Sequence, residues 1–119
     1  MNNCIFCKIA KGQAPFKLVY EDDTVMAIAS IEPVSKGHTV LIPKKHSVNV
    51  LDTDDKIMEH IGLKMKELSL KLIDDNNATG INILNANGED AQQSVNHLHF
   101  HLVPRYPHDG LDLWIRQGL

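Results

Sequence analysis

The chain has 119 residues, of which 43% are hydrophobic and 23% charged, and its net charge is −3 at pH 7. This size and composition predict one globular domain over residues 1–119, and the slight acidity argues against the basic surface that nucleic-acid binding requires. No apolar run of about 18 residues and no leader with a cleavage site is recognisable, so we expect no membrane span, no secretion and a cytoplasmic protein.

A short helix is expected over residues 4–11, ending at Gly12. It carries both cysteines of the chain, Cys4 and Cys7, as a C-x-x-C pair. In a reducing compartment such a pair is more often half of a zinc site or a redox pair than a structural disulfide. A zinc site would need two further ligands, and the seven histidines can supply them.

Three strands should follow. The stretches 17–21 and 24–30 alternate in polarity and are separated by Asp22 and Asp23, which predicts a β-hairpin. The apolar run over residues 38–43 predicts a third strand that is buried on both faces.

A long amphipathic helix is expected over residues 54–75, with Asp52 or Thr53 as its N-terminal cap. Its apolar residues recur at intervals of three or four and form one stripe. These residues are Ile57, Ile61, Met65, Leu68 and Leu72.

Two more strands are expected over residues 80–84 and 96–103, joined by a polar loop over residues 85–93. Strands, one helix and further strands follow one another without regular alternation. This order indicates an α+β domain with a mainly antiparallel five-stranded sheet, one long helix and a short N-terminal helix.

The last of these strands carries His97, His99 and His101 on alternate residues, with apolar residues between them. In an extended strand the three rings share one face, and neighbouring imidazoles lie roughly 6 to 7 Å apart. Each ring needs hydrogen-bond partners if it is buried, so this face should open to a ligand, a metal or water. The residues alone leave two functions open: a metal site, and covalent catalysis by a neutral imidazole.

Four segments carry a family pattern: residues 4–9 (CIFCKI), 19–23 (VYEDD), 37–46 (GHTVLIPKKH) and 93–105 (QSVNHLHFHLVPR). The last contains His-φ-His-φ-His-φ-φ, where φ is apolar. In these motifs the chain resembles the histidine triad (HIT) superfamily, and most of all its Hint branch as it occurs in bacteria. The resemblance covers nearly the whole chain and implies a homodimer whose sheets join across a two-fold axis.

The resemblance implies a hydrolase or transferase acting at the α-phosphorus of nucleoside monophosphate derivatives. His99 matches the nucleophile that forms a nucleotidyl-histidine intermediate, which suits an imidazole because the phosphoramidate is labile enough for water to release. His101 matches a residue that contacts the nonbridging phosphate oxygens, and His38 matches a fourth histidine from a neighbouring strand. Ser94 matches a hydroxyl that assists the leaving group.

The resemblance also implies where the nucleotide binds. Backbone N–H groups of Gln93, Ser94 and Val95 are expected at the phosphate, with an amide side chain at or beside Ala86, for which we take Asn87. Apolar residues are expected to form the nucleobase slot. They are Ile9, Ile28 and Ile31.

Two positions depart from the family pattern. Ser30 stands where relatives usually have an acidic residue that binds ribose, so ribose recognition is weakened or taken over by Glu32. Gln92 stands where a glycine is usual, and its side chain is expected to crowd the phosphate pocket.

In metal-containing relatives the cysteine pair combines with two histidines, which here are His46 and His97. Two thiolates and two imidazoles form a closed tetrahedral zinc set, so the resemblance implies a structural zinc ion held by Cys4, Cys7, His46 and His97. This role competes with a catalytic role for His97, and we favour the metal.

The leading hypothesis is a hydrolase of purine nucleoside phosphoramidates or related adenylated compounds. The alternatives are a dinucleoside polyphosphate hydrolase and a nucleotide- or zinc-binding module with little activity. A small nucleotide is the expected partner in each case, together with a second copy of the chain.

Overall fold

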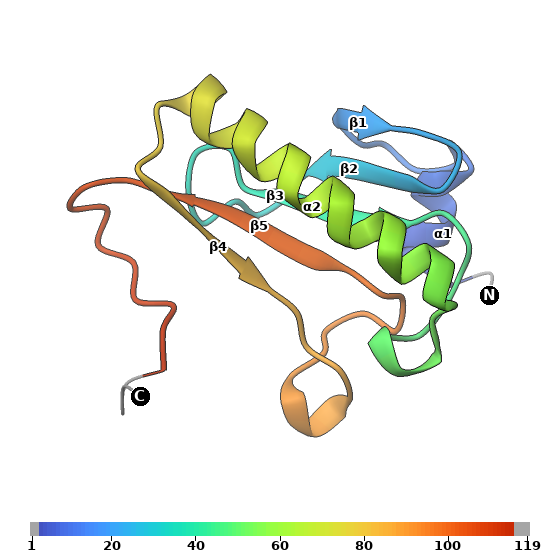
Figure 1. The fold of residues 1–119 in the computed structure, drawn as a ribbon. Helices are drawn as coiled ribbons and strands as arrows, with labels where there is room; N and C mark the ends of the chain where they lie inside the picture. The colour runs from blue at the N-terminus through green and yellow to red at the C-terminus, as the bar shows by residue number, and fades with distance from the viewer. Residues whose placement is uncertain (1–2, 116–119) are drawn as a thin grey trace.

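The computed structural model describes residues 3–115 and contains one five-stranded sheet, with a helix on each side of it (Figure 1). The sheet order is β1-β2-β3-β5-β4, and every neighbouring pair is antiparallel. The predicted α+β fold is confirmed. The elements are α1 (Ile5–Ala10), β1 (Leu18–Glu21), β2 (Val25–Ala29), β3 (Thr39–Pro43), α2 (Asp55–Asn76), β4 (Gly80–Leu84) and β5 (Phe100–Arg105), with 3₁₀ turns at Val50–Asp52 and Glu89–Ala91.

Each face of the sheet packs against its own helix. The predicted stripe of α2 covers one face, where Ile61, Leu68 and Leu72 are buried. On the opposite face Ile9 of α1 packs against β2 and β3, in a smaller cluster with Ile28 and three further apolar residues. The short helix α1 therefore stands over the sheet face opposite to α2 (Figure 1). No helix within residues 3–115 is long and apolar enough to cross a membrane, and the expected cytoplasmic location stays a prediction.

The caps and turns have local causes. Asp54, rather than the predicted Asp52 or Thr53, caps α2 by accepting hydrogen bonds from the N–H groups of Lys56 and Ile57. Asp52 is used one turn earlier, where its carboxylate accepts from the N–H of Asn49 in a capping box. Asp52 lies inside the 3₁₀ turn Val50–Asp52, which leaves Asp54 as the residue that caps α2.

The predicted strand over residues 96–103 is wrong at both ends, because β5 begins at Phe100 and runs through Pro104 to Arg105. Pairing of β5 with β3 ends at Leu102, so at Pro104 only β4 borders the strand. A proline is tolerated there because one side of the strand needs no N–H donor.

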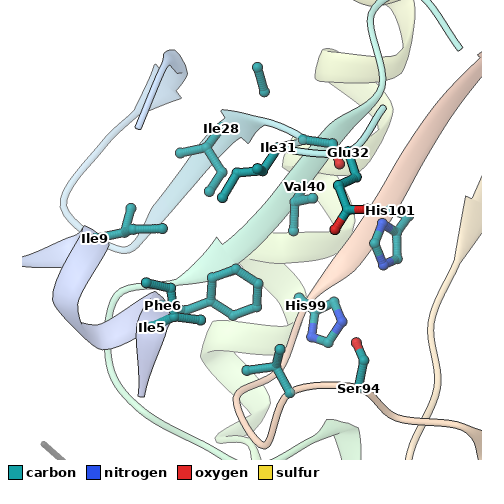
Figure 2. A pocket seen from close by; sticks show the side chains of 13 residues that line it. Ile5, Phe6, Ile9, Ile28, Ile31, Glu32, Val40, Ser94, His99 and His101 are labelled. Atoms are coloured by element: carbon teal, nitrogen blue, oxygen red, sulfur yellow. The ribbon is translucent and has the colours of Figure 1, made fainter. Parts of the chain in front are cut away.

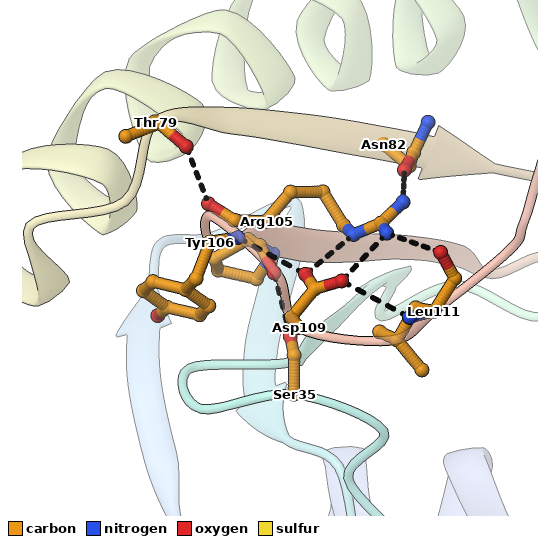
Figure 3. Close-up of polar contacts among 8 residues, drawn as sticks. Ser35, Thr79, Asn82, Arg105, Tyr106, Asp109 and Leu111 are labelled. Atoms are coloured by element: carbon orange, nitrogen blue, oxygen red, sulfur yellow. Dashed lines mark hydrogen bonds and ion pairs between the residues drawn. The ribbon is translucent and has the colours of Figure 1, made fainter.

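The end of β5 is fixed by Arg105 (Figure 3). Its guanidinium forms a two-pronged ion pair with Asp109, at 2.9 Å for both nitrogen–oxygen pairs, and also donates to the Asn82 side chain on β4 at 2.8 Å. This arrangement holds the chain after β5 against the sheet. β4 remains an edge strand among the described residues, and the expected dimer stays a prediction.

Candidate active site and metal centre

The predicted alternation of the histidine segment is present, although it begins before β5. Leu98, Phe100 and Leu102 are buried in the cluster that α2 covers. His99 and His101 face the opposite side, where they border a cavity together with residues of α1 and β2. The polar and apolar faces therefore separate as expected, and the histidines are on the α1 side of the sheet.

The backbone fixes the proton on the His99 ring. Nδ1 of His99 lies 2.8 Å from the carbonyl oxygen of His97. A carbonyl can only accept, so Nδ1 carries the hydrogen and donates it. In the neutral ring Nε2 then has a free lone pair, which is the form a nucleophilic imidazole needs.

His101 is fixed by a second hydrogen-bond chain. The N–H of Val34 donates to Nδ1 of His38 at 3.1 Å, which leaves the hydrogen of the neutral His38 ring on Nε2. That Nε2–H donates to Nδ1 of His101 at 2.9 Å, so His101 in turn carries its hydrogen on Nε2. Burial, together with the nearby His99 and His38, lowers the pKa of His101 to about 4, and the ring is neutral at pH 7. His101 is therefore a hydrogen-bond donor through Nε2.

His38 owes its position to the turn before β3. Its ring is 7% exposed, and burial lowers its pKa. The preceding Gly37 has a φ of +87°, and a Cβ there would lie 2.7 Å from the side-chain nitrogen of Asn76. Glycine is needed at this point to bring His38 beside His101.

The cavity beside these rings has a volume of about 270 Å³ (Figure 2). One wall is apolar, and the other carries the rings of His99 and His101 with the hydroxyl of Ser94, which points toward His99 (Figure 2). An apolar slot ending in two imidazoles suits a ligand with a flat apolar part and a polar end. The remaining lining residues are Ile5, Phe6, Ile9, Ile28, Ala29, Ser30, Ile31, Glu32, Val40 and Val95.

A second cavity of about 160 Å³ adjoins the first, and Ser94, His99 and His101 line both. The other residues of the second cavity come from the end of β4 and the loop after it, and none is charged. They are Leu84, Asn85, Ala86, Ala91 and Gln92. The two histidines and the serine thus stand between an apolar slot and an uncharged polar recess.

Most residues predicted for the nucleotide site line the first cavity, but Asn87 and Gln93 line neither. The Gln93 amide accepts from the N–H of Gly88 at 2.8 Å and donates to the carbonyl of Val95 at 2.9 Å. Asn87 accepts from the N–H of Val50 at 2.8 Å. Both side chains shape the loop that carries Ser94.

Gln92 lines only the second cavity, and its backbone is left-handed with a φ of 70°. A glycine adopts this conformation without strain, which explains physically why the family pattern has one here. Four residues that line the first cavity were not predicted, namely Ile5, Phe6, Ala29 and Val40. As single apolar residues they could not be distinguished from core, although Phe6 stands between the two cysteines.

His60 and His108 had no predicted role. His108 is exposed, whereas Nε2 of His60 lies 2.7 Å from the carboxylate of Asp22. Burial opposes ionisation of Asp22, but hydrogen bonds from Tyr20, Val25, His60 and Thr24 hold its pKa well below its usual range. This contact joins α2 to the β1–β2 turn and has no link to the cavity.

The four predicted metal ligands come together beside the cavity. The donor atoms of Cys4, Cys7, His46 and His97 all lie within 4.8 Å of one another. The Cys4 and Cys7 sulfurs are 3.3 and 3.5 Å from Nδ1 of His97, and the Cys7 sulfur is 3.3 Å from Nδ1 of His46. Adjacent ligands of a tetrahedral zinc ion with these bond lengths are roughly 3.5 Å apart, so the spacing fits.

The orientation of the His97 ring fits the same ion. Its Nε2 lies 2.8 Å from the carbonyl of Pro43 and therefore donates to it, which leaves a lone pair on Nδ1, facing the sulfurs. The ring is fully buried and lines neither cavity. The two roles weighed for His97 are thus separated in space, and its ring lies with the metal donors.

Comparison with known proteins identifies the family. A model of the HIT domain matches residues 11–108. The chain belongs to the HIT domain family. The resemblance inferred from the sequence is thereby confirmed.

The relatives of this chain include HIT proteins named for an activity and others that are uncharacterized. The chain is 46% identical over 112 residues to an uncharacterized HIT-like protein of Borreliella burgdorferi, covering 92% of this chain and 81% of that protein. It is 39% identical over 108 residues to an adenosine 5′-monophosphoramidase of Candida albicans, covering 87% and 70%. It is 33% identical over 118 residues to an adenylylsulfatase of Arabidopsis thaliana, covering 99% of this chain and 59% of that protein.

A solved structure of a zinc-bound histidine triad family protein from Mycobacterium smegmatis has the same fold as this HIT protein. Its TM-score is 0.89 at 34% identity, and the match covers 94% of this chain and 81% of that one. HIT proteins similar to this chain thus include hydrolases and a protein that binds zinc.

Proposed function

We propose that this HIT protein hydrolyses purine nucleoside 5′-phosphoramidates, or closely related adenylated compounds, through a nucleotidyl intermediate on His99. One observation carries the proposal: the carbonyl of His97 holds the proton of the His99 ring on Nδ1, so that Nε2 is a ready nucleophile beside the cavity. The nucleobase takes the apolar slot. The phosphate lies between the His99 and His101 rings and Ser94.

The reaction has two displacements. In the first, Nε2 of His99 bonds to phosphorus and the P–N bond of the substrate breaks; the Ser94 hydroxyl donates its proton to the departing nitrogen and takes one up from solvent in exchange. In the second, water attacks phosphorus, the bond to His99 breaks, and one proton returns to solvent. The Nε2–H of His101 donates to a nonbridging oxygen in both steps, where negative charge develops.

The recess favours a small leaving group. It measures about 160 Å³, and none of the residues that line it is a lysine or an arginine that could hold further phosphates. A polyphosphate leaving group would have no counter-charge there. The names of the Candida and Arabidopsis relatives describe adenylated substrates of this kind. We therefore place the dinucleoside polyphosphate hydrolase second.

Cys4, Cys7, His46 and His97 are the residues that would hold the zinc ion. With two thiolates and two imidazoles the set leaves no open position, so the ion would supply structural support rather than a reactive water. Burial and the neighbouring Cys4 raise the pKa of the Cys7 thiol, so binding the ion must displace a proton.

Trapping the intermediate tests the proposal. The protein is quenched in acid-free denaturant during turnover of adenosine 5′-phosphoramidate and digested, and peptides are analysed by mass spectrometry. We expect one AMP on the peptide containing His99, and none in a His99→Asn variant. A wild-type protein that turns over in a clear burst with no adduct on that peptide would refute the covalent route. A protein without turnover would support the binding-module alternative.

We also infer a homodimer through the open edge of β4, where Ile83 is 46% exposed. Sedimentation equilibrium of the wild type and of an Ile83→Lys variant tests this directly. A monomeric wild type at all concentrations would refute it.

A further inference from the structure

We propose that the Cys4, Cys7, His46 and His97 centre does more than stabilise the fold: its metal positions the nucleotide site through the Phe6 ring and the His97 carbonyl. This inference rests on the proposed function for the identity of the nucleotide. It predicts that metal occupancy and nucleotide affinity are coupled.

The first connection is the aromatic ring between the two cysteines. The Phe6 ring centroid lies 5.7 Å from that of His97, edge-on at 77°, and 5.2 Å from that of His99, tilted at 55°. Phe6 also lines the first cavity, where we place the nucleotide (Figure 2). One side chain thus touches a metal ligand, the nucleophile and the space for the substrate.

The second connection is the backbone of His97. The ring of this residue faces the two sulfurs, and its carbonyl accepts the Nδ1–H of His99. The N–H of the next residue, Leu98, donates to the carbonyl of Ser47 at 2.9 Å, and Ser47 directly follows the metal ligand His46. The same short segments that carry two of the ligands therefore orient the His99 ring.

The short helix α1, which supplies part of the apolar wall of the cavity, is not stable without tertiary contacts. α1 has six residues, and three of them, Ile5, Phe6 and Ile9, line the cavity. Isolated helices shorter than about 12 residues are marginal in water. α1 is anchored by burial of Ile9 and by Cys4 and Cys7, which stand at its N-terminal cap and in its first turn. Without the metal, only the apolar anchor and weak thiol–imidazole contacts remain.

Direct nucleotide binding tests the coupling without using hydrolysis. AMP affinity is measured by calorimetry on zinc-loaded protein and on protein freed of metal by chelation, at a temperature where circular dichroism shows both folded. We expect AMP to bind the metal-free protein about 10-fold more weakly or worse, within the usual range of coupling between sites. A change below twofold would overturn the proposal. Failure of AMP to bind the loaded protein would overturn the proposed function and this inference together.

A Phe6→Leu variant tests the route, and Phe16→Leu is its control because Phe16 is 40% exposed and does not line the cavity. Cobalt(II) replaces zinc so that its absorption spectrum reports on the four ligands. In the wild type and in Phe16→Leu, AMP should shift the cobalt bands, because coupling is reciprocal. In Phe6→Leu the shift should be reduced while cobalt still binds. An unchanged spectrum on addition of saturating AMP to the wild type would contradict the coupling.

Discussion

The role of His38 can be tested by separating its shape from its hydrogen bond. His38 does not line the first cavity, and it reaches the site only by donating to Nδ1 of His101 at 2.9 Å. Replacing it with leucine fills the buried space but removes the donor. Replacing it with glutamine retains an N–H at about the same reach as the imidazole Nε2. The two variants differ in the donor rather than in bulk.

The expected effect follows from what His101 loses. Without the donor from His38, the His101 ring can turn or move its hydrogen to Nδ1, and Nε2–H no longer points at the phosphate in a fixed way. Removing one preorganised donor from a developing oxyanion costs about 10²- to 10³-fold in kcat. The lower end, about 100-fold, is expected for His38→Leu because the His101 ring itself remains. KM should change little, since the contact is formed chiefly in the transition state.

The assay is steady-state hydrolysis of adenosine 5′-phosphoramidate, with thermal unfolding of each variant as the control for folding. His38→Gln should retain kcat within about 10-fold of the wild type, because a donor to His101 is present. The leucine variant also leaves the N–H of Val34 without its acceptor, for a stability cost of about 1 kcal/mol. Equal activities of the leucine and glutamine variants would refute the donor argument, as would a leucine variant that keeps the wild-type kcat.

Three other changes have defined outcomes. Ser94→Ala should lower kcat by about 30-fold for amine leaving groups, the equivalent of one hydrogen bond of about 2 kcal/mol to a charged group. An equal loss with a leaving group that departs unprotonated would contradict the role of Ser94 in protonating the leaving group. Asp22→Ala should cost about 2 to 3 kcal/mol in urea unfolding and Asp22→Asn about half of that, with unchanged kcat, because four donors share this carboxylate far from the cavity. The third change is in pH. His101 has a pKa of about 4 in the folded state and about 6.5 when unfolded, so the unfolded chain binds more protons between these values and stability should fall as pH falls from 6.5 to 4. By pH 5 the wild type should have lost about 2 kcal/mol of unfolding free energy through this ring. Urea unfolding is measured in chelator at pH 7.5 and pH 5, and the His101→Gln variant should not show this loss. Equal changes with pH in both proteins would contradict the lowered pKa of His101.

The elements with strong periodicity were predictable from the sequence. The apolar stripe of α2 repeats over several turns, and β4 is bounded as predicted at Gly80–Leu84. The start of β5 was not predictable, because a strand is defined by its neighbours. Residues 96–99 continue the alternating pattern, but pairing with β3 begins only at Phe100 and pairing with β4 only at His101. Alternation thus predicts which way side chains point more reliably than it predicts where pairing starts.

The residues of the site were predictable from the sequence, but the ring nitrogen that carries hydrogen in each histidine was not. The family pattern named His38, His99 and His101, but the direction of each hydrogen bond depends on backbone groups brought in by folding. The N–H of Val34 and the carbonyl of His97 decide which ring nitrogens carry hydrogen. The apolar wall was only partly predictable for a similar reason. Val40 is buried like any core residue, and only the fold shows that it also faces the cavity.

In our proposals, the two interpretations of the histidine alternation, metal site and covalent catalysis, apply to different rings. Within residues 3–115 the one group of three or more potential metal ligands includes His97 but neither His99 nor His101. The His99 and His101 rings are 5.2 Å apart, and both rings line two cavities together with Ser94. No cysteine lines either cavity, and the one carboxylate there, that of Glu32, does not belong to the group of potential metal ligands. His97 connects the two proposed sites, because its peptide carbonyl accepts the Nδ1–H of His99 while its ring faces the sulfurs. A His97→Asn variant should therefore lose metal and also lower kcat, whereas His46→Asn should weaken metal binding with its effect on kcat reversed by excess zinc. Full activity of metal-free His97→Asn would show that the His97 ring and its metal are not needed to hold the carbonyl that orients His99.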